Sequence, residues 1–518
     1  MDPRTSSVDK VAPRNYAPPD ADVAGGSWAM LVDVLLDANR RSPQTLAVSD
    51  GTRSLSYKQL TMLSSVLRKV VSRETTCQRV GLMLPASTAF PGALFGVFWS
   101  SKVAVPLNFL LRPEELVRIV QNAGLDLILT VRPFQEQVQA LPARAIFLED
   151  LPIKRRLFWA TLKRHPPAPT VDPNDTAVIL YTSGTTAEPK GVELTYRNLQ
   201  SNCVDAIVSL NIDPRQRFLN MLPPFHVFGL TANVLIPVFL GASVYAIPRF
   251  SPLAAVRTVA EKRISIILAI PSMYAAMLRT KSTKPDAFQS IYLAVSGGEP
   301  LPDSVREGFE KRFGVTLRQG YGLSETSPVV AACSATAYRQ GTVGRPIRNV
   351  EIRIADADGR DLPTGADGEI LIRGPGVMKG YYKKPEETRR VINPQGWFAS
   401  GDIGHLDADG YLSITGRAKE MLIIGGENVF PREIEAVLEA HEGVLQAAVI
   451  GVADGVRGEA PVAFVIPRKD AKVTEDELRN FARRKLAGFK TPKRIEIRND
   501  LPTGPTGKIL KRRLREWL

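Results

Sequence analysis

The stretch from Tyr181 to Gly191, YTSGTTAEPKG, gathers hydroxyl side chains, two glycines and one lysine. Hydroxyl groups and backbone N–H groups freed by glycine can bind several phosphate oxygens at once, and a lysine adds a positive charge. The spacing is not that of the usual phosphate loop, because Pro189 precedes Lys190 and Gly191 follows it. The stretch therefore indicates either a phosphate loop of another kind or a polar surface turn.

The position of this stretch favours the first interpretation. The apolar run AVILYT directly before it predicts a buried strand. In α/β proteins the carboxyl ends of such strands are the edge at which ligands bind. We therefore expect Thr182, Ser183, Thr185, Thr186 and Lys190 to contact phosphate.

The length and composition of the chain limit the classes of protein to which it can belong. The chain has 518 residues, more than one ordinary core, so two or more domains are expected. It is 44% hydrophobic with 39 Gly and 39 Pro, which is typical of a globular, loop-rich α/β protein. Three widely spaced cysteines argue against a disulfide framework or a zinc site and suit a reducing compartment, and the four histidines lack metal-ligand spacing.

Two features bear on location. The amino terminus shows no early apolar run, so no secretory signal is expected. Residues 218–248 contain no Asp, Glu, Lys or Arg and are long enough to span a membrane. They also hold four prolines and several polar residues, which favours a buried strand–loop–helix segment. We expect a cytoplasmic protein.

Basic side chains are concentrated at one end of the chain. The net charge is +14, and residues 479–518 carry 13 Lys/Arg against 3 Asp/Glu. Such an excess predicts contact with a polyanion. Nucleic acid is not expected, because no zinc-finger, RNA-binding or basic-zipper signature is present. The two alternatives are a phosphate of a bound cosubstrate and an anionic membrane surface, to which the basic link 153–165 could also contribute.

The apolar pattern divides the chain into regions. Residues 1–25 are rich in Pro and Asp and are predicted to be a disordered tail. RVGLMLP, LDLILTV, TAVILYT and SIILAIP predict short buried strands of parallel sheets, interleaved with helices. After about residue 340, Asp-Gly turns between alternating strands predict hairpins. Their carboxylates do not have the spacing of a calcium loop.

A last unit begins near Lys419. Pro431 is placed for the first turn of a helix, and Thr474 with Glu477 forms a predicted capping box. With the strands QAAVIGV and PVAFVIP, this predicts a small α+β domain of about 100 residues.

Seven motifs occur in a fixed order along the chain. They are YTSGTTAEPKG, FHVFGL (225–230), SGGEPLP (296–302), GYGLSETSP (320–328), SGDIG (400–404), GRAKEMLIIGGENVFPREIE (416–435) and LPTGPTGKILKRRL (501–514). In this order they resemble the adenylate-forming superfamily of acyl-CoA synthetases, peptide-synthetase adenylation domains and luciferases. The resemblance covers residue 28 to the end. It implies an α/β fold with a large domain (26–416) of parallel-sheet subdomains and a small β-barrel-like subdomain, followed by a mobile α+β lid (417–518).

The resemblance also implies the reaction. A carboxylate attacks the α-phosphorus of ATP, which gives an acyl-AMP and pyrophosphate, and the acyl group then passes to a thiol. Negative charge grows on phosphate oxygens in that transition state, so fixed cations accelerate the step. Lys508, in a flexible Gly/Pro loop, is the implied main cation, and Glu325 would hold Mg²⁺.

The resemblance implies further roles for individual residues. Asp402 would accept hydrogen bonds from both ribose hydroxyls, with Arg417 supporting the same ribose, and His226 would border the acyl carboxylate. The nucleotide would also be held by Gly184, Gly298, Glu299, Pro300, Gly320, Tyr321, Gly322 and Ser324. Ser324 stands where the family commonly has Thr, and Ala187 replaces a frequent Gly, so the phosphate loop is expected to be stiffer.

The thiol is expected to be coenzyme A. GGENVFP resembles the acyl-CoA synthetase version of its motif, in which Gly426 lets pantetheine pass close to the backbone. Lys419 matches the hinge about which the lid swings, and Lys490, with Lys493 and Arg494, is a candidate for binding a CoA phosphate. The apolar segment FHVFGLTANVLIPVF (225–239), which offers no cation for a second carboxylate, predicts a medium- or long-chain aliphatic acid. Alternatives are an aromatic acid, transfer to a carrier protein, and a non-catalytic nucleotide-binding relative. The oligomeric state stays open.

Overall fold

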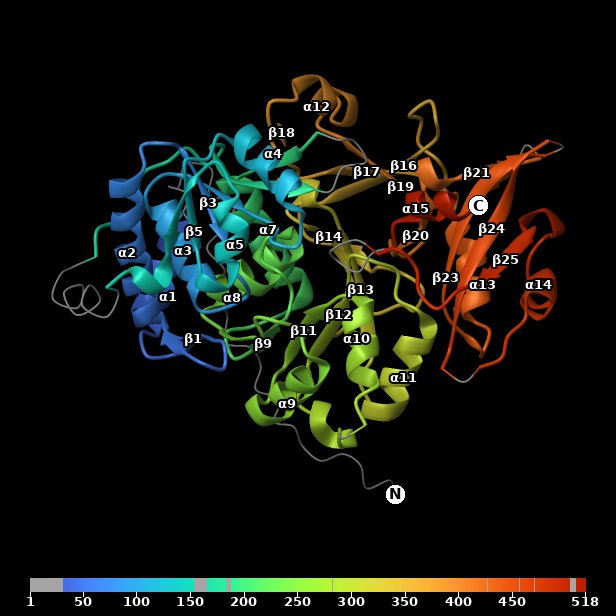
Figure 1. Cartoon of the computed structure of the whole chain (residues 1–518), viewed down its shortest axis with the longest axis horizontal. Coiled ribbons are helices and arrows are strands. Elements are labelled where there is room, and N and C mark those ends of the chain that lie inside the picture. The colour runs from blue at the N-terminus through green and yellow to red at the C-terminus, as the bar shows by residue number, and fades with distance from the viewer. Residues whose placement is uncertain are drawn as a thin grey trace.

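The computed structural model describes residues 31–152, 165–182, 188–281, 283–425, 427–455, 457–469, 471–503 and 509–518. Several predictions fall outside these residues and stay predictions: the tail 1–25, nearly all of the basic link, Ser183, Gly184, Thr185, Thr186, Gly426 and Lys508. The described chain forms a large α/β body and, at the right of Figure 1, a smaller carboxyl-terminal unit coloured orange to red.

One sheet of the large body has seven strands. Its order is β18 (Gly380–Tyr381), β8 (Lys190–Thr195), β7 (Thr176–Thr182), β4 (Val103–Pro106), β3 (Arg79–Met83), β5 (Leu127–Thr130) and β6 (Arg144–Phe147). The strands from β7 to β6 pair in parallel, whereas β8 and β18 are antiparallel to their neighbours. The predicted buried strands are confirmed, since β5 is buried at every residue and β3 at four of five.

Helices cover this sheet. They are α1 (Leu31–Arg41), α2 (Tyr57–Glu74), α3 (Ala89–Trp99), α4 (Pro113–Ala123) and α5 (Gln135–Gln139). Helix α2 begins with a capping box between Ser56 and Gln59, which satisfies backbone N–H groups of its first turn. Helix α3 is apolar and almost wholly buried, and Gly92 and Gly96 allow it to lie directly against Leu63 and Leu67 of α2.

A second sheet of nine strands lies beside the first. Its order is β15 (Arg345–Pro346), β14 (Val329–Ala332), β13 (Leu317–Gly322), β12 (Leu293–Ser296), β11 (Ile266–Ala269), β9 (Arg217–Asn220), β10 (Ser243–Ala246), β1 (Leu46–Ser49) and β2 (Ser54–Ser56). Strands β13 to β1 of this order are mutually parallel. The accompanying helices are α7 (Tyr196–Leu210), α9 (Pro252–Lys262), α10 (Pro271–Leu278) and α11 (Asp303–Phe313).

The uncharged segment 218–248 is part of this sheet and its cover. It forms the end of β9, a π-helical stretch (Phe228–Leu235), the short helix α8 (Ile236–Leu240) and β10. Most of its side chains are buried, which confirms the strand–loop–helix prediction. Within the described part of the chain, no helix is long and apolar enough to cross a membrane.

The hairpins predicted after residue 340 form a third sheet. It contains β16 (Glu351–Ala355), β17 (Gly368–Arg373), β19 (Phe398–Leu406) and β20 (Leu412–Arg417), all antiparallel, with β16 and β20 at its edges. Beyond β20 the backbone pairing continues: the Val343 N–H donates to the Leu412 carbonyl and the Leu412 N–H donates to the Gly344 carbonyl, each over 2.8 Å. Helix α12 (Pro385–Val391) lies between β17 and β19 in the chain and follows the two-residue strand β18.

The carboxyl-terminal unit is a small α+β fold. Its strands are β21 (Leu422–Ile424), β22 (Glu427–Val429), β23 (Val444–Asp454), β24 (Gly458–Pro467) and β25 (Arg494–Ile497), and its helices are α13 (Pro431–Glu439), α14 (Glu475–Arg483) and α15 (Lys511–Leu514). Pro431 opens α13, and Thr474 and Glu477 form a capping box on α14, as predicted. Since β20 ends at Arg417 and β21 begins at Leu422, the change of sheet falls between these residues.

Candidate active site

The predicted site residues follow the carboxyl ends of parallel strands. Thr182 is the last residue of β7 and pairs with Lys190, the first residue of β8, so the phosphate-loop stretch closes a hairpin. Gly298, Glu299 and Pro300 come directly after β12. The register Ser296↔Gln319 places β12 beside β13, which carries Gly320, Tyr321 and Gly322. The Leu301 N–H donates to Gln319 Oε1 over 3.2 Å, so the two segments remain side by side beyond the strands.

Two glycines at this edge have no room for a side chain or adopt a backbone that disfavours one. A Cβ built on Gly322 would lie 2.0 Å from the backbone oxygen of Pro328. Gly298 has φ +82°, in the left-handed region that favours glycine. Gly298 and Gly322 are therefore required by the turning and the close approach of the backbone, independently of any ligand.

Asp402 lies at the centre of a preformed polar group. It is buried, and its two carboxylate oxygens are bonded to different partners: Tyr321 Oη donates to Oδ2 over 2.7 Å, and Arg417 Nε donates to Oδ1 over 3.0 Å. Burial and the Asp402 charge raise the pKa of Tyr321 well above its ordinary value, so its hydroxyl stays a donor. The strand register Asp402↔Arg417 in the β19–β20 hairpin sets the ion pair. Three residues predicted separately are thus brought together.

Glu325 and Lys190 meet through a residue that was not predicted. Tyr381 Oη donates to Glu325 Oε1 over 2.8 Å, and Lys190 Nζ lies 3.6 Å from the centroid of the Tyr381 ring. Ser324 and Glu325 stand in a 3₁₀ turn directly after β13. A single carboxylate oxygen donor fits Mg²⁺, which usually binds one or two carboxylates together with substrate phosphates. Among the described residues no cluster of three or more potential metal ligands occurs.

His226 precedes the π-helical stretch and is held by its backbone. Its N–H donates to the carbonyl of Pro223 and its carbonyl accepts from Leu230. Burial lowers the pKa of His226 to about 4, so the ring is neutral at physiological pH. Its Nε2 atom is buried without a hydrogen-bond partner among the described residues. Such an atom is costly in an apolar surrounding, and a bound polar group would satisfy it.

The described residues predicted to act in the lid do not meet in one cluster. Lys419 is exposed in the 3₁₀ turn Ala418–Glu420 between the third sheet and the lid. Phe430, at the start of α13, packs on Gly416, since a Cβ there would lie 2.6 Å from its ring. Lys490 Nζ is bonded to both carboxylate oxygens of Glu433 at 2.8 Å, and Lys493 to Asp454 at 2.9 Å. The lysines proposed for CoA therefore already have acidic partners.

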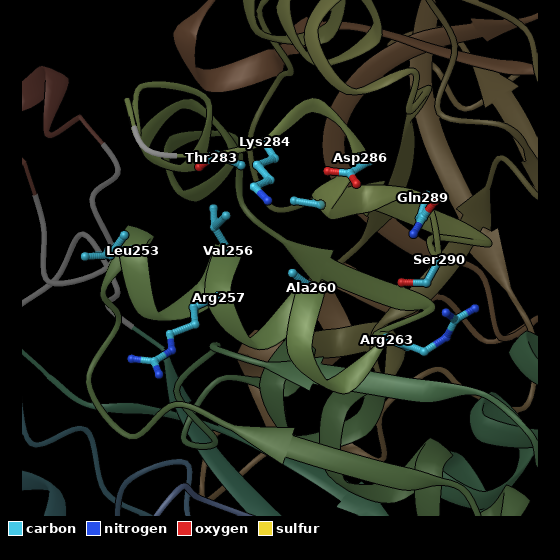
Figure 2. A pocket seen from close by; sticks show the side chains of 11 residues that line it. Leu253, Val256, Arg257, Ala260, Arg263, Thr283, Lys284, Asp286, Gln289 and Ser290 are labelled. Atoms are coloured by element: carbon cyan, nitrogen blue, oxygen red, sulfur yellow. The ribbon is translucent and has the colours of Figure 1, made fainter.

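A large open pocket of about 430 Å³ lies elsewhere. Its lining comes from α9 and from the turn Pro285–Phe288, as Figure 2 shows, and includes Arg257, Arg263 and Lys284. Arg263 and Ser290 precede β11 and β12, so this pocket is at the amino-terminal edge of those strands. The predicted residues follow the carboxyl ends of the same strands. The pocket is therefore separate from the candidate active site.

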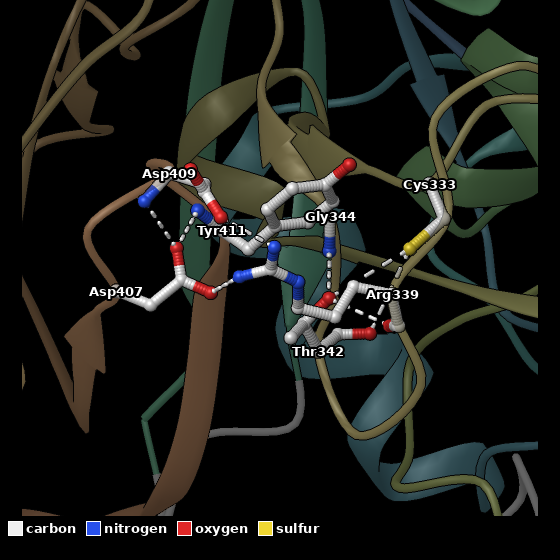
Figure 3. Close-up of polar contacts among 7 residues, drawn as sticks. All are labelled: Cys333, Arg339, Thr342, Gly344, Asp407, Asp409 and Tyr411. Carbon is white, nitrogen blue, oxygen red and sulfur yellow. Dashed lines mark hydrogen bonds and ion pairs between the residues drawn. The ribbon is translucent and has the colours of Figure 1, made fainter.

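The hairpin that carries Asp402 and Arg417 is braced at its far end (Figure 3). Arg339 is paired with Asp407 and, at 2.5 Å, with Asp409, and its guanidinium lies 4.4 Å from the centroid of the Tyr411 ring. Leu412 adds two backbone bonds to this contact, since its carbonyl accepts from the Val343 N–H and its N–H donates to the Gly344 carbonyl. Two carboxylates of the Asp-rich turn thus pair with an arginine.

Sequence reasoning missed Tyr381, Lys384 and Glu387. All three surround Lys190 or the loop that carries it, although they are nearly 200 residues away in the chain. Pro385 followed by two glutamates signals a helix start, but nothing in the local sequence YYKKPEE indicates which lysine that helix will face. The pairing of β18 with β8 creates the contact.

The large α/β body and the small carboxyl-terminal unit match known proteins. The family model for the AMP-binding enzyme matches residues 35–382, and that for the AMP-binding enzyme C-terminal domain matches residues 433–508. The chain belongs to the AMP-binding enzyme family, within the adenylate-forming superfamily.

Individual relatives give the class of reaction. The chain is 34% identical to a feruloyl-CoA synthase of Amycolatopsis sp, over 92% of this chain and 96% of that protein. It is 32% identical to a long-chain-fatty-acid–CoA ligase of Yersinia pestis, over 98% of each chain. Among solved structures it resembles ATP-bound MatB from Rhodopseudomonas palustris, with TM-score 0.87 and 27% identity over 94% of this chain and 98% of that one. The enzyme class is that of the AMP-forming acid–CoA ligases.

Proposed function

We propose that the described cluster is the adenylation site and that each predicted residue acts there in a defined way. The observation that carries this proposal is the Tyr321–Asp402–Arg417 group, in which a tyrosine hydroxyl and an arginine already hold the two oxygens of a buried carboxylate. Asp402 would exchange one of these bonds for the ribose hydroxyls of ATP. The turns around Gly298 and Gly320 would frame the adenine, with the remaining nucleotide contacts as the family motifs imply.

Three sets of groups would stabilise the negative charge of the triphosphate. Lys190 and the loop hydroxyls would bind the terminal phosphates, Glu325 would hold Mg²⁺, and Lys508 would be delivered by the lid. Bound Mg²⁺ supplies positive charge to the phosphate oxygens as pyrophosphate leaves. Because cations aimed at developing charge stabilise the transition state more than the ground state, this arrangement accelerates attack by the acid.

The neutral His226 would border the acid. A neutral imidazole can donate one hydrogen bond to a carboxylate oxygen without ion-pairing with it. Its unpartnered buried nitrogen supports this role. After adenylation the lid would rotate about Lys419 and bring the CoA thiol past Gly426 to the acyl carbonyl.

The acid is proposed to be a medium- or long-chain aliphatic carboxylate. The segment after His226 is apolar and buried, and residues 218–248 offer no cation for a second carboxylate. The relatives named as long-chain-fatty-acid–CoA ligases support this choice. The similarity to feruloyl-CoA synthases favours an aromatic acid as the second candidate.

A panel of acids decides between the two. With ATP, Mg²⁺ and CoA, kcat/KM for acyl-CoA formation is expected to be highest for straight-chain acids, and hydroxycinnamic and benzoic acids serve as the aromatic set. A clear preference for the aromatic set would overturn the aliphatic assignment. Acyl-AMP formation without any CoA thioester would instead indicate a carrier protein as acceptor.

Peripheral contact of a cytoplasmic enzyme with an anionic membrane is part of the proposal. It rests on the +10 excess of residues 479–518. Screened charge would drive such binding, so it should weaken as salt increases. Co-sedimentation with phosphatidylserine vesicles at low and high ionic strength tests it, and no binding at low salt would contradict it.

A further inference from the structure

Lys190, the lysine of the phosphate-loop stretch, has partners in this structure. Its Nζ atom lies 3.6 Å from the centroid of the Tyr381 ring and 3.2 Å from Glu387 Oε2. Its side chain is 26% exposed, so it is neither buried nor freely solvated. Strand β18, which contains Tyr381, pairs with β8, which begins at Lys190, and this pairing fixes the approach of the two side chains.

A second contact ties down the end of the same loop. Lys384 Nζ is 2.9 Å from Glu188 Oε2 and 2.9 Å from Glu387 Oε1. Glu188 precedes Lys190 by two residues. Glu387 therefore lies between two lysines, and hydrogen bonds from Lys384 and then Lys190 lower its pKa. The carboxylate would keep one cationic partner if the other were withdrawn.

The segment carrying these groups is itself well fixed. Thr388 Oγ1 accepts from the Tyr381 N–H over 2.9 Å and donates to the Lys384 carbonyl over 3.0 Å. A Cβ on Gly380 would lie 2.9 Å from the Thr388 side chain, so the strand and helix α12 meet closely. The turn between β18 and α12 thus presents Tyr381, Lys384 and Glu387 together.

Tyr381 also reaches the other side of the triphosphate site. Its hydroxyl donates to Glu325 Oε1 over 2.8 Å, while its ring contacts Lys190. Burial, followed by the Glu325 charge, raises the pKa of Tyr381. One side chain therefore contacts both the proposed phosphate-binding lysine and the proposed metal ligand.

We propose that Tyr381 and Glu387 are positioning residues for Lys190, the lysine at the end of the phosphate-loop stretch. Glu387 holds Lys190 while the site is empty and releases it to ATP. Tyr381 aligns Lys190 with Glu325. This rests on the proposed function. Ion pairs and cation–π contacts near the surface are individually weak, so a polyphosphate can outcompete them. Lys384 compensates Glu387 after the release, which keeps the carboxylate paired.

The test is ATP binding by isothermal titration calorimetry in EDTA, without acid or CoA. Glu387→Gln removes the competitor for Lys190 and should tighten ATP binding about threefold. Glu386→Gln is the matched control, because it removes the same charge from the same helix but from a residue paired only with Arg389 among its described partners. Equal ATP dissociation constants in Glu387→Gln and Glu386→Gln would overturn the holding role.

Two substitutions separate the functions of Tyr381. Tyr381→Leu removes ring and hydroxyl and should weaken metal-free ATP binding about fivefold. Tyr381→Phe keeps the ring, so metal-free binding should stay within about twofold of wild type, while the Mg²⁺ concentration for half-maximal ATP–pyrophosphate exchange should rise severalfold. Melting curves confirm folding of each variant.

The outcomes are distinguishable. Wild-type binding in both tyrosine variants, with an unchanged Mg²⁺ requirement, overturns the alignment role and leaves the proposed function intact. Absence of ATP binding by the wild-type protein both in EDTA and with Mg²⁺ overturns both.

Discussion

The nucleotide side of the large domain and the basic end of the lid both carry many charged side chains, and they use them differently. At Asp402 and at Lys190, a few polar and charged side chains from segments far apart in the chain contact one another. In the lid, basic side chains are numerous, and several of them contact an acid of the same unit: Lys490 with Glu433, Lys493 with Asp454 and Lys511 with Glu420 and Glu435.

The distribution of charge along the lid sequence explains why its basic residues have acidic partners. Residues 479–518 have a net charge of +10, but residues 417–478 hold seven Lys/Arg and twelve Asp/Glu, a net of −5. The lid as a whole therefore carries +5. Folding places the acidic first part against the basic second part, so a high local charge density in the sequence is weak evidence for a polyanionic partner. Convergence of a few groups from several elements is stronger evidence for a ligand.

Two lysines make the comparison concrete. Lys511 is 2.7 Å from Glu435 and 3.0 Å from Glu420; burial opposes its charge, but the two carboxylates outweigh it and raise the pKa of Lys511. Lys190 has one carboxylate, shared with Lys384, and an aromatic ring. We infer that Lys511 is a structural cation of the lid, whereas Lys190 is available to a ligand.

Among the residues that the structure describes, the largest effect is expected at Asp402. Asp402→Asn removes the charge that Arg417 and the Tyr321 hydroxyl face, and the ribose loses an ionic acceptor. Loss of one partner of a buried charged pair costs about 2–5 kcal/mol. We therefore expect kcat/KM for ATP to fall about hundredfold, which is about 2.7 kcal/mol. Steady-state kinetics with saturating acid and CoA measure it, and a change below about fivefold would contradict the ribose assignment.

A different readout is expected for Lys511. Lys511→Met removes the cation 2.7 Å from Glu435, whose side chain is 7% exposed, and leaves it the more distant Arg432 at 3.9 Å. We expect a loss of about 2 kcal/mol in the free energy of unfolding, below the 3–5 kcal/mol of a fully buried pair because Lys511 is 23% exposed. Urea denaturation measures this, with the exposed neighbour Arg512→Met as control. The ATP dissociation constant should not change; if it did, Lys511 would belong to the active site.

The neutral state of His226 predicts a pH dependence of stability. Because its folded pKa is about 4 and its ordinary value 6.5, the unfolded chain binds more protons between these values. The stabilisation is complete above about pH 6.5 and is lost as the pH falls toward 4. At pH 5 the loss is about 2 kcal/mol. Unfolding free energies of wild type and His226→Gln at pH 7.5 and 5 check it, since the variant should lose less by that amount.

The smallest effect is expected at Lys490. It can leave Glu433 for a CoA phosphate at little cost, because exposed ion pairs contribute about 0–1 kcal/mol. Lys490→Gln should raise KM for CoA about fivefold and leave KM for dephospho-CoA unchanged. Lys472→Gln, an exposed lid lysine, is the control. Equal effects on both thiols would remove Lys490 from the CoA site.

Much of the fold could be predicted because its signals are local. Apolar runs gave the strands β3, β5, β7 and β11, and Pro431 and the Thr474 capping box gave two lid helices. The ordered motifs located Asp402, Tyr321 and Arg417 individually. Their joining could not be derived from local pattern, because it depends on the approach of β13 to the β19–β20 hairpin.

Long-range pairing also explains what was missed. Tyr381 and Glu387 affect Lys190 only because a two-residue strand adds to the edge of the seven-stranded sheet. A strand of two residues is too short to show the hydrophobic periodicity from which a strand is predicted. The partners of Lys490 and Lys511 were missed for the same reason, since Glu433 and Glu435 come from a helix more than fifty residues earlier in the chain.

The division of work between the two domains is tested most directly by Lys508→Ala in the two half-reactions. If Lys508 acts on the phosphoryl transition state alone, acid-dependent ATP–pyrophosphate exchange should fall by a factor of about a hundred or more, corresponding to about 3 kcal/mol. Formation of acyl-CoA from preformed acyl-AMP and CoA should stay within about threefold of wild type. Equal losses in both half-reactions, or exchange that persists in the variant, would contradict the account.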